Sequence, residues 1–174
     1  MKVPFVKMHA LGNDFVIMRG NTAPEFSEKF IRNISNRQTG IGFDQLIWLQ
    51  PPLDENNDIF YRIYNADGGE VEQCGNGARC IASLLDETET KDGNKYMMEY
   101  GHGIIEAKVG PDGQVSLNMG IPSLEPKDLP FITNQQTAPY QISTSEDDFE
   151  LYVVSMGNPH AVVFVRDTKT IDVA

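Results

Sequence analysis

Two cysteines, Cys74 and Cys80, carry the strongest candidate chemistry of this sequence. The segment from Gly75 onward is predicted to be helical, so Cys74 is expected at a helix N-terminus. Unpaired N–H groups and the positive end of the helix dipole stabilise a thiolate at such a position and raise its reactive fraction. The alternative is that Cys74 is only a small buried hydrophobe, which is the commonest fate of a free cysteine.

Glycines flank Cys74 and open its surroundings to a ligand. Gly75 and Gly77 carry no side chain, and the N–H groups of Gly75, Asn76 and Gly77 are placed to hold a carboxylate. This loop therefore offers both a base and an anion site.

Cys80 is expected to have a different role from Cys74. Six helical residues separate the two cysteines by about 9 Å along the axis and about 240° around it. That distance is too long for a disulfide, so we predict two reduced thiols, with Cys80 in the core. The spacing is not CxxC and only three histidines occur (His9, His102 and His160), so no metal site is predicted.

Four asparagines share one context: each lies in a Gly-bearing loop at a strand end, where polar side chains can converge on a pocket. They are Asn13, Asn65, Asn76 and Asn158. Together they could clamp the ammonium and carboxylate of an amino acid, although turn formation explains each one singly. His160 could tune a thiol, act as a general base or only end a turn.

Apolar alternation and turn residues predict the elements that position these groups. Residues 11–14 form a tight turn. Ser27 caps a helix that ends near Gly40, and a second helix covers residues 78–85. A boundary near Gly120 divides the chain into domains 1–119 and 120–174. The predicted strands are 5–9, 15–19, 45–50, 59–64, 96–100, 104–109, 114–119, 151–156 and 161–165.

Composition excludes several classes of partner. Fourteen Lys and Arg against 25 Asp and Glu give a net charge of −11, and the basic residues are scattered, which argues against nucleic acid. No window approaches the roughly 20 apolar residues of a membrane span. A soluble, cytosolic protein is expected.

A faint internal repeat links the two predicted domains. The segments around Asn13 and Asn158 both read apolar residue, Gly, Asn, turn residue, apolar strand. If a second unit begins at the later segment, its counterpart of Cys74 falls beyond the last residue of the sequence. The repeat would imply a partner half that these 174 residues lack, although a Gly-Asn pair between strands is common by itself.

Five motifs together resemble the diaminopimelate epimerase family over essentially the whole chain. They are Leu11-Gly12-Asn13-Asp14-Phe15, Gly40-Ile41-Gly42-Phe43-Asp44-Gln45, Tyr64-Asn65-Ala66-Asp67-Gly68, Gln73-Cys74-Gly75-Asn76-Gly77-Ala78-Arg79-Cys80 and Gly157-Asn158-Pro159-His160.

The resemblance implies a fold and a reaction. The fold is α+β, with a mixed or antiparallel sheet wrapped around a central helix and two pseudo-symmetric domains, the second incomplete here. The reaction is interconversion of LL- and meso-diaminopimelate in lysine biosynthesis, without pyridoxal phosphate or another cofactor, in a cytoplasmic homodimer. One cysteine removes the α-proton and a second, on the opposite face, returns one.

Matching position by position, the resemblance assigns roles to individual residues. Cys74 is the first catalytic cysteine and His160 adjusts thiol acidity. The substrate-binding positions are Asn13, Gln45, Asn65, Gly75, Asn76 and Asn158.

The sequence departs from the family pattern in one large respect. The second cysteine, in an Ala-Cys-Gly-Ser-Gly loop, and a Gly-Ala-Gly-Glu-Thr segment are both absent. The family's terminal strand, which closes the first domain, is also absent, which predicts an exposed sheet edge. A cut or proteolysed piece and a truncated gene both fit. The rival functions are an inactive fragment or binding module of the same fold and, less favoured, a Cys/His thiol hydrolase.

Overall fold

The computed structural model describes residues 3–22, 24–89, 91, 93–144 and 147–169. Contacts divide the chain into two compact units, Met1–Met119 and Gly120–Ala174. Each unit has its own hydrophobic core.

The first unit is built on one mixed sheet. Its strands lie in the order β1-β2-β3-β4-β6-β7-β8, and β5 pairs with β4. The pairs β2/β3 and β4/β6 are parallel and the others are antiparallel. The strands are β1 (Phe5–Ala10), β2 (Asn13–Arg19), β3 (Gln45–Gln50), β4 (Ile59–Asn65), β5 (Glu70–Val71), β6 (Lys95–Tyr100), β7 (Gly103–Val109) and β8 (Val115–Asn118).

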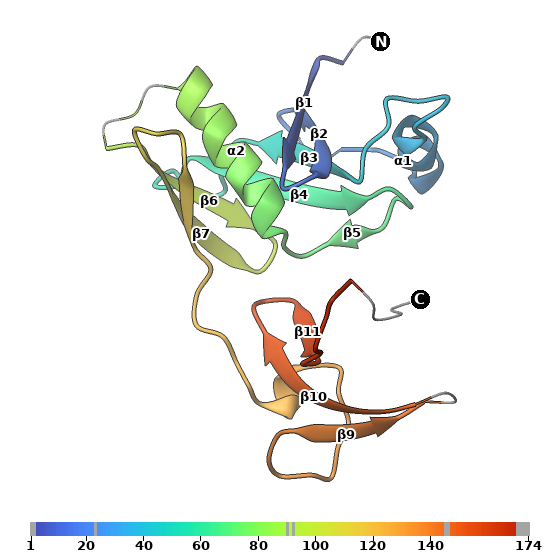
Figure 1. Cartoon of the computed structure of the whole chain (residues 1–174). Helices are drawn as coiled ribbons and strands as arrows, with labels where there is room; N and C mark the ends of the chain where they lie inside the picture. Colours follow the sequence, from blue (N-terminus) through green and yellow to red (C-terminus); the bar gives the residue numbers. More distant parts are fainter. Residues whose placement is uncertain (1–2, 23, 90, 92, 145–146, 170–174) are drawn as a thin grey trace. The chain divides into compact units, whose positions relative to one another are not determined.

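Helix α2 (Gly75–Thr88) is the centre of this unit. It contacts both edge strands of the sheet, β1 and β8, and also β6 and β7, so the sheet curls around it (Figure 1). Its apolar side chains Ile81 and Leu85 are fully buried among those of the sheet. The prediction of an α+β fold with a mixed sheet wrapped around a central helix is confirmed.

Helix α1 (Glu28–Ser35) lies on the other face of the sheet and begins as predicted, because the Ser27 side chain accepts a hydrogen bond from the N–H of Phe30. The prediction that it continues to near Gly40 is wrong. Asn36 leaves the helical conformation, and its side-chain oxygen accepts from the N–H groups of Gln38 and Thr39, which would otherwise extend the helix.

The first hairpin has a shorter turn than predicted. Asn13 pairs with Ala10 and Asp14 pairs with His9, so both belong to β2 rather than to the turn. Leu11 and Gly12 alone make the turn, both with positive φ, as a two-residue hairpin turn of type I′ requires. The consequence is that Asn13 has a fixed place in a strand ladder.

The second unit holds a three-stranded antiparallel sheet, in the order β11-β10-β9, and a short 3-10 turn, η1 (Pro126–Asp128). Its core contains Tyr140, Leu151 and Val153. The prediction of a strand over 161–165 is wrong, because the ladder with β10 runs from Ser155↔Pro159 only to Tyr152↔Val162. The strands are β9 (Tyr140–Ser143), β10 (Asp148–Ser155) and β11 (Pro159–Val162).

The sequence patterns did not predict β5, β9 and η1, all of which are short.

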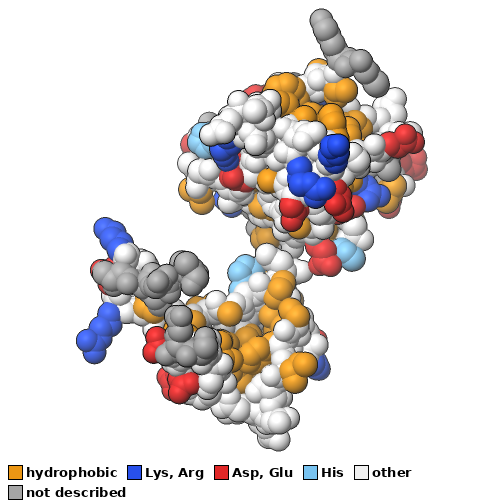
Figure 2. Space-filling model, turned by 90° about the vertical axis from the view of Figure 1, so that its right-hand side faces the viewer, with side chains coloured by type: hydrophobic (Ala, Val, Ile, Leu, Met, Phe, Trp, Pro, Cys, Tyr) orange, Lys and Arg blue, Asp and Glu red, His pale blue; other side chains and the backbone are white. Residues whose placement is uncertain are grey.

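Large apolar side chains of the second unit are exposed, among them Ile121, Ile132 and Phe164. Figure 2 shows hydrophobic side chains gathered on the visible face of this unit. Across the described ranges, no helix is both long enough and apolar enough to cross a membrane.

Candidate active site

Three predicted substrate-binding side chains meet at one end of the first unit's sheet. Asn13 begins β2, Gln45 begins β3 and Asn65 ends β4. These ends coincide because β2 and β3 are parallel while β4 runs antiparallel to β3, with Gln45 opposite Asn65. Gln45 Nε2 donates to Asn65 Oδ1 over 2.9 Å, so these two amides are already joined.

Cys74 reaches the same end of the sheet from α2. It is the N-cap residue of this helix, as the sequence predicts, and has extended backbone angles. Its half-buried thiol donates to Asn13 Oδ1 over 3.7 Å. The structure therefore brings the proposed catalytic thiol into contact with one of the predicted binding residues.

The N-terminus of α2 leaves backbone donors available next to the thiol. The first bond of the helix runs from Ala78 N–H to Cys74 C=O, so the N–H groups of Gly75, Asn76 and Gly77 precede it. The Cys74 side chain does not cap them, and the first turn has no acidic residue. An anion can occupy this position, since the N–H groups and the helix dipole both favour negative charge.

Gly77 explains how α2 starts so close to the sheet. A Cβ at this position would lie 3.1 Å from Ile47 Cδ1 and 3.4 Å from Phe15 Cε1. A larger residue would push the helix N-terminus away from β2 and β3. Asn76, one residue earlier, accepts a hydrogen bond from Arg79 through its side-chain oxygen.

A charged network behind Asn13 was not singled out from the sequence. Arg37 binds both carboxylate oxygens of Asp14, at 3.0 and 2.7 Å, and also Asp44 Oδ1 at 2.8 Å. Lys7 lies 3.2 Å from Asp14. The Arg37 hydrogen bonds, with help from Lys7, hold the pKa of Asp14 well below its usual range. The only signal in the sequence was that Asp14 and Asp44 each lie within one of the five motifs that resemble the family.

Two further residues beside the site escaped prediction. Gln73 is buried, and its Nε2 donates to Met119 Sδ over 3.8 Å. Tyr61 is fully buried on β4, and its hydroxyl has no hydrogen-bond partner in the described part of the chain. Burial, with smaller contributions from Tyr100 and Cys74, raises the pKa of Tyr61 far above its ordinary value.

Asn158 and His160 belong to the second unit. They lie at the turn between β10 and β11, where the His160 ring nitrogen Nδ1 is 3.0 Å from the carbonyl oxygen of Asn158. Asn158 is half-buried and His160 is exposed. Their predicted roles stay predictions. Asn13 begins the strand after the turn of an antiparallel hairpin, whereas Asn158 lies within the turn of another.

Cys74 and Cys80 differ in the way the sequence predicts. Both are free thiols, and Cys80 is 3% exposed in the core around α2. Burial raises the pKa of Cys80 to about 11. Within the described residues, no group of three or more His, Cys, Asp or Glu side chains could hold a metal ion.

We therefore expect iodoacetamide to modify Cys74 and leave Cys80 untouched in the folded protein at pH 8. Roughly one Cys80 thiol in a thousand is ionised three pH units below its pKa, and the ring of core side chains blocks access. Peptide mass spectrometry after a timed reaction measures both sites. Equal modification of the two cysteines would contradict the burial of Cys80, and labelling in denaturant provides the control in which both react.

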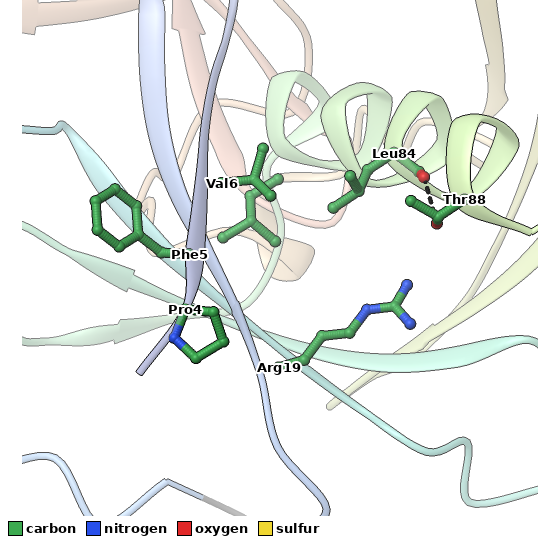
Figure 3. A pocket seen from close by; sticks show the side chains of 7 residues that line it. Pro4, Phe5, Val6, Arg19, Leu84 and Thr88 are labelled. Atoms are coloured by element: carbon green, nitrogen blue, oxygen red, sulfur yellow. Dashed lines mark hydrogen bonds between the residues drawn. The ribbon is translucent and has the colours of Figure 1, made fainter. Parts of the chain in front are cut away.

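An apolar cavity lies elsewhere in the first unit. It encloses about 310 Å³ between β1, β2 and the C-terminal end of α2, where Leu84 and Thr88 line it (Figure 3). Arg19, the charged residue at its rim, already pairs with Glu89 at 2.8 Å. Its lining offers no group for proton transfer, so the polar cluster around Cys74 is the better candidate for chemistry.

Comparison with known proteins relates the chain to one enzyme family. The model of diaminopimelate epimerase matches residues 5–125. The chain is 44% identical over 176 residues to diaminopimelate epimerase of Acinetobacter baylyi, covering all of this chain and 63% of that protein. It is 45% identical over 168 residues to that of Nitrosomonas europaea, covering 96% of this chain and 61% of that protein. The chain thus spans about three fifths of these relatives.

Solved structures share the fold at low identity. A hydroxyproline epimerase from Agrobacterium vitis has a TM-score of 0.70 at 18% identity, covering 94% of this chain and 52% of that chain. A probable proline racemase from Agrobacterium radiobacter has a TM-score of 0.72 at 16% identity, covering 93% and 52%. These likenesses support the α+β fold described above.

Proposed function

The chain belongs to the diaminopimelate epimerase family, and from this premise we propose that it supplies one of the two catalytic thiols of a cofactor-independent amino-acid epimerase. The observation that carries the proposal is the position of Cys74, at the N-cap of α2 and in contact with Asn13. The proposed substrates are LL- and meso-diaminopimelate, in cytoplasmic lysine biosynthesis by a homodimer.

In the proposed reaction Cys74 exchanges a proton with the α-carbon of the substrate. The thiolate takes the α-proton, which forms an S–H bond and leaves the C–H electron pair on the α-carbon. Inversion then needs a second acid on the opposite face, because a group on one face can only return a proton to that face. Cys80 cannot be that acid, since it is buried in the core.

The second thiol is proposed to lie in the part of the relatives' length that this chain does not span. The family resemblance puts it in an Ala-Cys-Gly-Ser-Gly loop, and no such loop occurs in these residues. Asn158 is proposed to bind substrate, and His160 is proposed to adjust the acidity of a thiol. These roles rest on the motif match alone.

Backbone N–H groups are proposed to stabilise the carbanion. Deprotonation at the α-carbon moves negative charge onto the α-carboxylate, so donors that hold the carboxylate are worth more as the charge grows. The N–H groups of Gly75, Asn76 and Gly77 are available for this. The amides of Asn13, Gln45 and Asn65 are proposed to bind the remaining polar groups of the substrate.

The test measures exchange of the substrate's α-hydrogen with solvent, in this chain and in a longer protein that contains it. Diaminopimelate is incubated with the protein in deuterated water, loss of the α-proton signal is followed by NMR, and stereoisomers are separated chromatographically. The 19.4 kDa chain is expected to exchange the α-hydrogen without inverting the centre. A longer protein that contains these residues and a second thiol is expected to do both. Absence of exchange in both proteins would contradict the proposal and favour a binding module of the same fold.

A further inference from the structure

The carboxylate of Asp44 holds the side chain of Asn13 in one of its two orientations. Asn13 Nδ2 donates to Asp44 Oδ2 over 3.1 Å, and the backbone N–H of Asp14 donates to the same oxygen over 3.0 Å. A carboxylate accepts hydrogen bonds and cannot donate them. The amide nitrogen of Asn13 must therefore face Asp44, and its oxygen faces Cys74 Sγ, 3.7 Å away.

Asp44 is itself fixed from several directions. Its Oδ1 accepts from Arg37 over 2.8 Å, and its backbone N–H lies 3.0 Å from both the carbonyl and the carboxylate of Asp14. Its own carbonyl accepts from the N–H of Ala66 over 3.1 Å. Asp44 thus ties the β2 hairpin to the segment that follows Asn65, and its carboxylate cannot turn away from Asn13 without breaking these contacts.

We propose that Asp44 is a positioning residue that sets the polarity which Asn13 presents to the Cys74 thiol. With Asn13 Oδ1 toward Sγ, the S–H group has an acceptor and the protonated thiol is favoured. With the amide reversed, its N–H₂ group would donate to the thiolate instead. The α2 N-terminus favours the thiolate, whereas the Asn13 orientation that Asp44 imposes favours the protonated thiol. The two effects oppose each other. This inference rests on the proposed role of Cys74.

Other ionisable groups near Cys74 do not account for this balance. Tyr61 on β4 and Cys80 on α2 interact electrostatically with Cys74, but burial raises the pKa of both, that of Cys80 to about 11. Both are therefore neutral from about pH 6 to about pH 9. Arg79 on α2 donates a hydrogen bond to the Asn76 side chain, and the Glu72 carboxylate, two residues before Cys74, is 59% exposed. Asp44 acts through the amide it orients.

The test measures the pH profile of Cys74 alkylation in the 174-residue chain, by peptide mass spectrometry. Asp44→Ala removes the acceptor that holds Asn13 Nδ2, so the Asn13 amide is free to reverse and donate to the thiolate. We expect the profile to move to lower pH and the rate at neutral pH to rise about 3- to 10-fold. Asp112→Ala is the charge-matched control, because it also removes one carboxylate, from a surface turn, and we expect it to leave the profile unchanged.

A double-substitution cycle separates orientation from simple loss of charge. In an Asn13→Ala background, Asp44→Ala is expected to produce no further change, since the amide that transmits the effect is gone. An equal shift in that background would show a direct charge effect and overturn the inference. So would an unchanged profile of Asp44→Ala in the native background. Circular dichroism confirms that each variant is folded.

A measurement on the unsubstituted chain keeps the test independent of folding of the variants. The Asn13 side-chain protons and the Asp14 amide proton donate to one oxygen, so NMR is expected to show a cross-peak between them and slow exchange of the Asn13 protons with water. Absence of both would overturn the inference. Because alkylation does not require diaminopimelate, failure of substrate exchange with this effect intact would count against the proposed function alone.

Discussion

Replacing Cys74 by alanine is expected to lower the rate of α-hydrogen exchange of diaminopimelate by at least about 100-fold, because a positioned acid–base group contributes about 10²- to 10⁴-fold. The substitution removes the thiol and leaves the backbone donors of Gly75, Asn76 and Gly77 in place. Substrate binding is therefore expected to survive while proton transfer fails. The rate is measured by NMR in deuterated water and binding by calorimetry.

Cys80→Ala is the matched control for this result. It removes the same thiol group from the same helix, but from the core side, where Cys80 is 3% exposed. We expect it to retain α-hydrogen exchange. If Cys74→Ala exchanged as fast as the unsubstituted chain, or if Cys80→Ala lost exchange while remaining folded, the proposed role of Cys74 would be wrong.

Gly68→Ala is expected to lower the free energy of unfolding of the first unit by about 2–4 kcal/mol, from left-handed backbone strain and overpacking together. Gly68 has φ of +95°, and a Cβ there would lie 2.5 Å from the Cα of Glu28. Neither atom belongs to a flexible side-chain end, so the start of α1 must move. The fluorescence of Trp48, the one tryptophan in the sequence, follows urea unfolding of this unit, since Trp48 belongs to its buried core.

Gly113→Ala separates the cost of backbone strain from the cost of steric overlap. Gly113 also has a positive φ, of +77°, but no atom lies within 4 Å of its Cβ position. We expect a loss of about 1 kcal/mol from backbone strain alone. Equal losses in the two variants would show that the steric overlap with Glu28 costs nothing.

The position of α1 matters for the site because Arg32 and Ser35 of this helix hydrogen-bond to the carbonyls of Asp67 and Ala66, next to Asn65.

Local signals in the sequence predicted those parts of the molecule that depend on neighbouring residues. Ser27 predicted the start of α1, because a cap acts on the next few N–H groups. The Ala, Ile and Leu residues of 78–85 predicted a buried helix and so placed Cys74 at a helix N-terminus. The resemblance to a family predicted the sheet around that helix and the candidate residues.

Patterns that needed a distant partner were predicted poorly. β11 ended where its ladder with β10 stopped, although the apolar run continues to Val165. One local feature was also missed, the end of α1 at Asn36. Asn13 joined β2 because Ala10 pairs with it across the hairpin. An apolar run or a turn residue shows that a strand or turn is nearby and does not say which residues receive hydrogen-bond partners.

The sequence by itself determined that Cys74 stands before a helix with a glycine-rich first turn, because capping and backbone freedom act over a few residues. Only the tertiary structure decided which way the Asn13 amide points. That orientation depends on Asp44, 31 residues away, and on Arg37 beside it. Strand order and register brought these residues together, and both are properties of the whole core of the first unit.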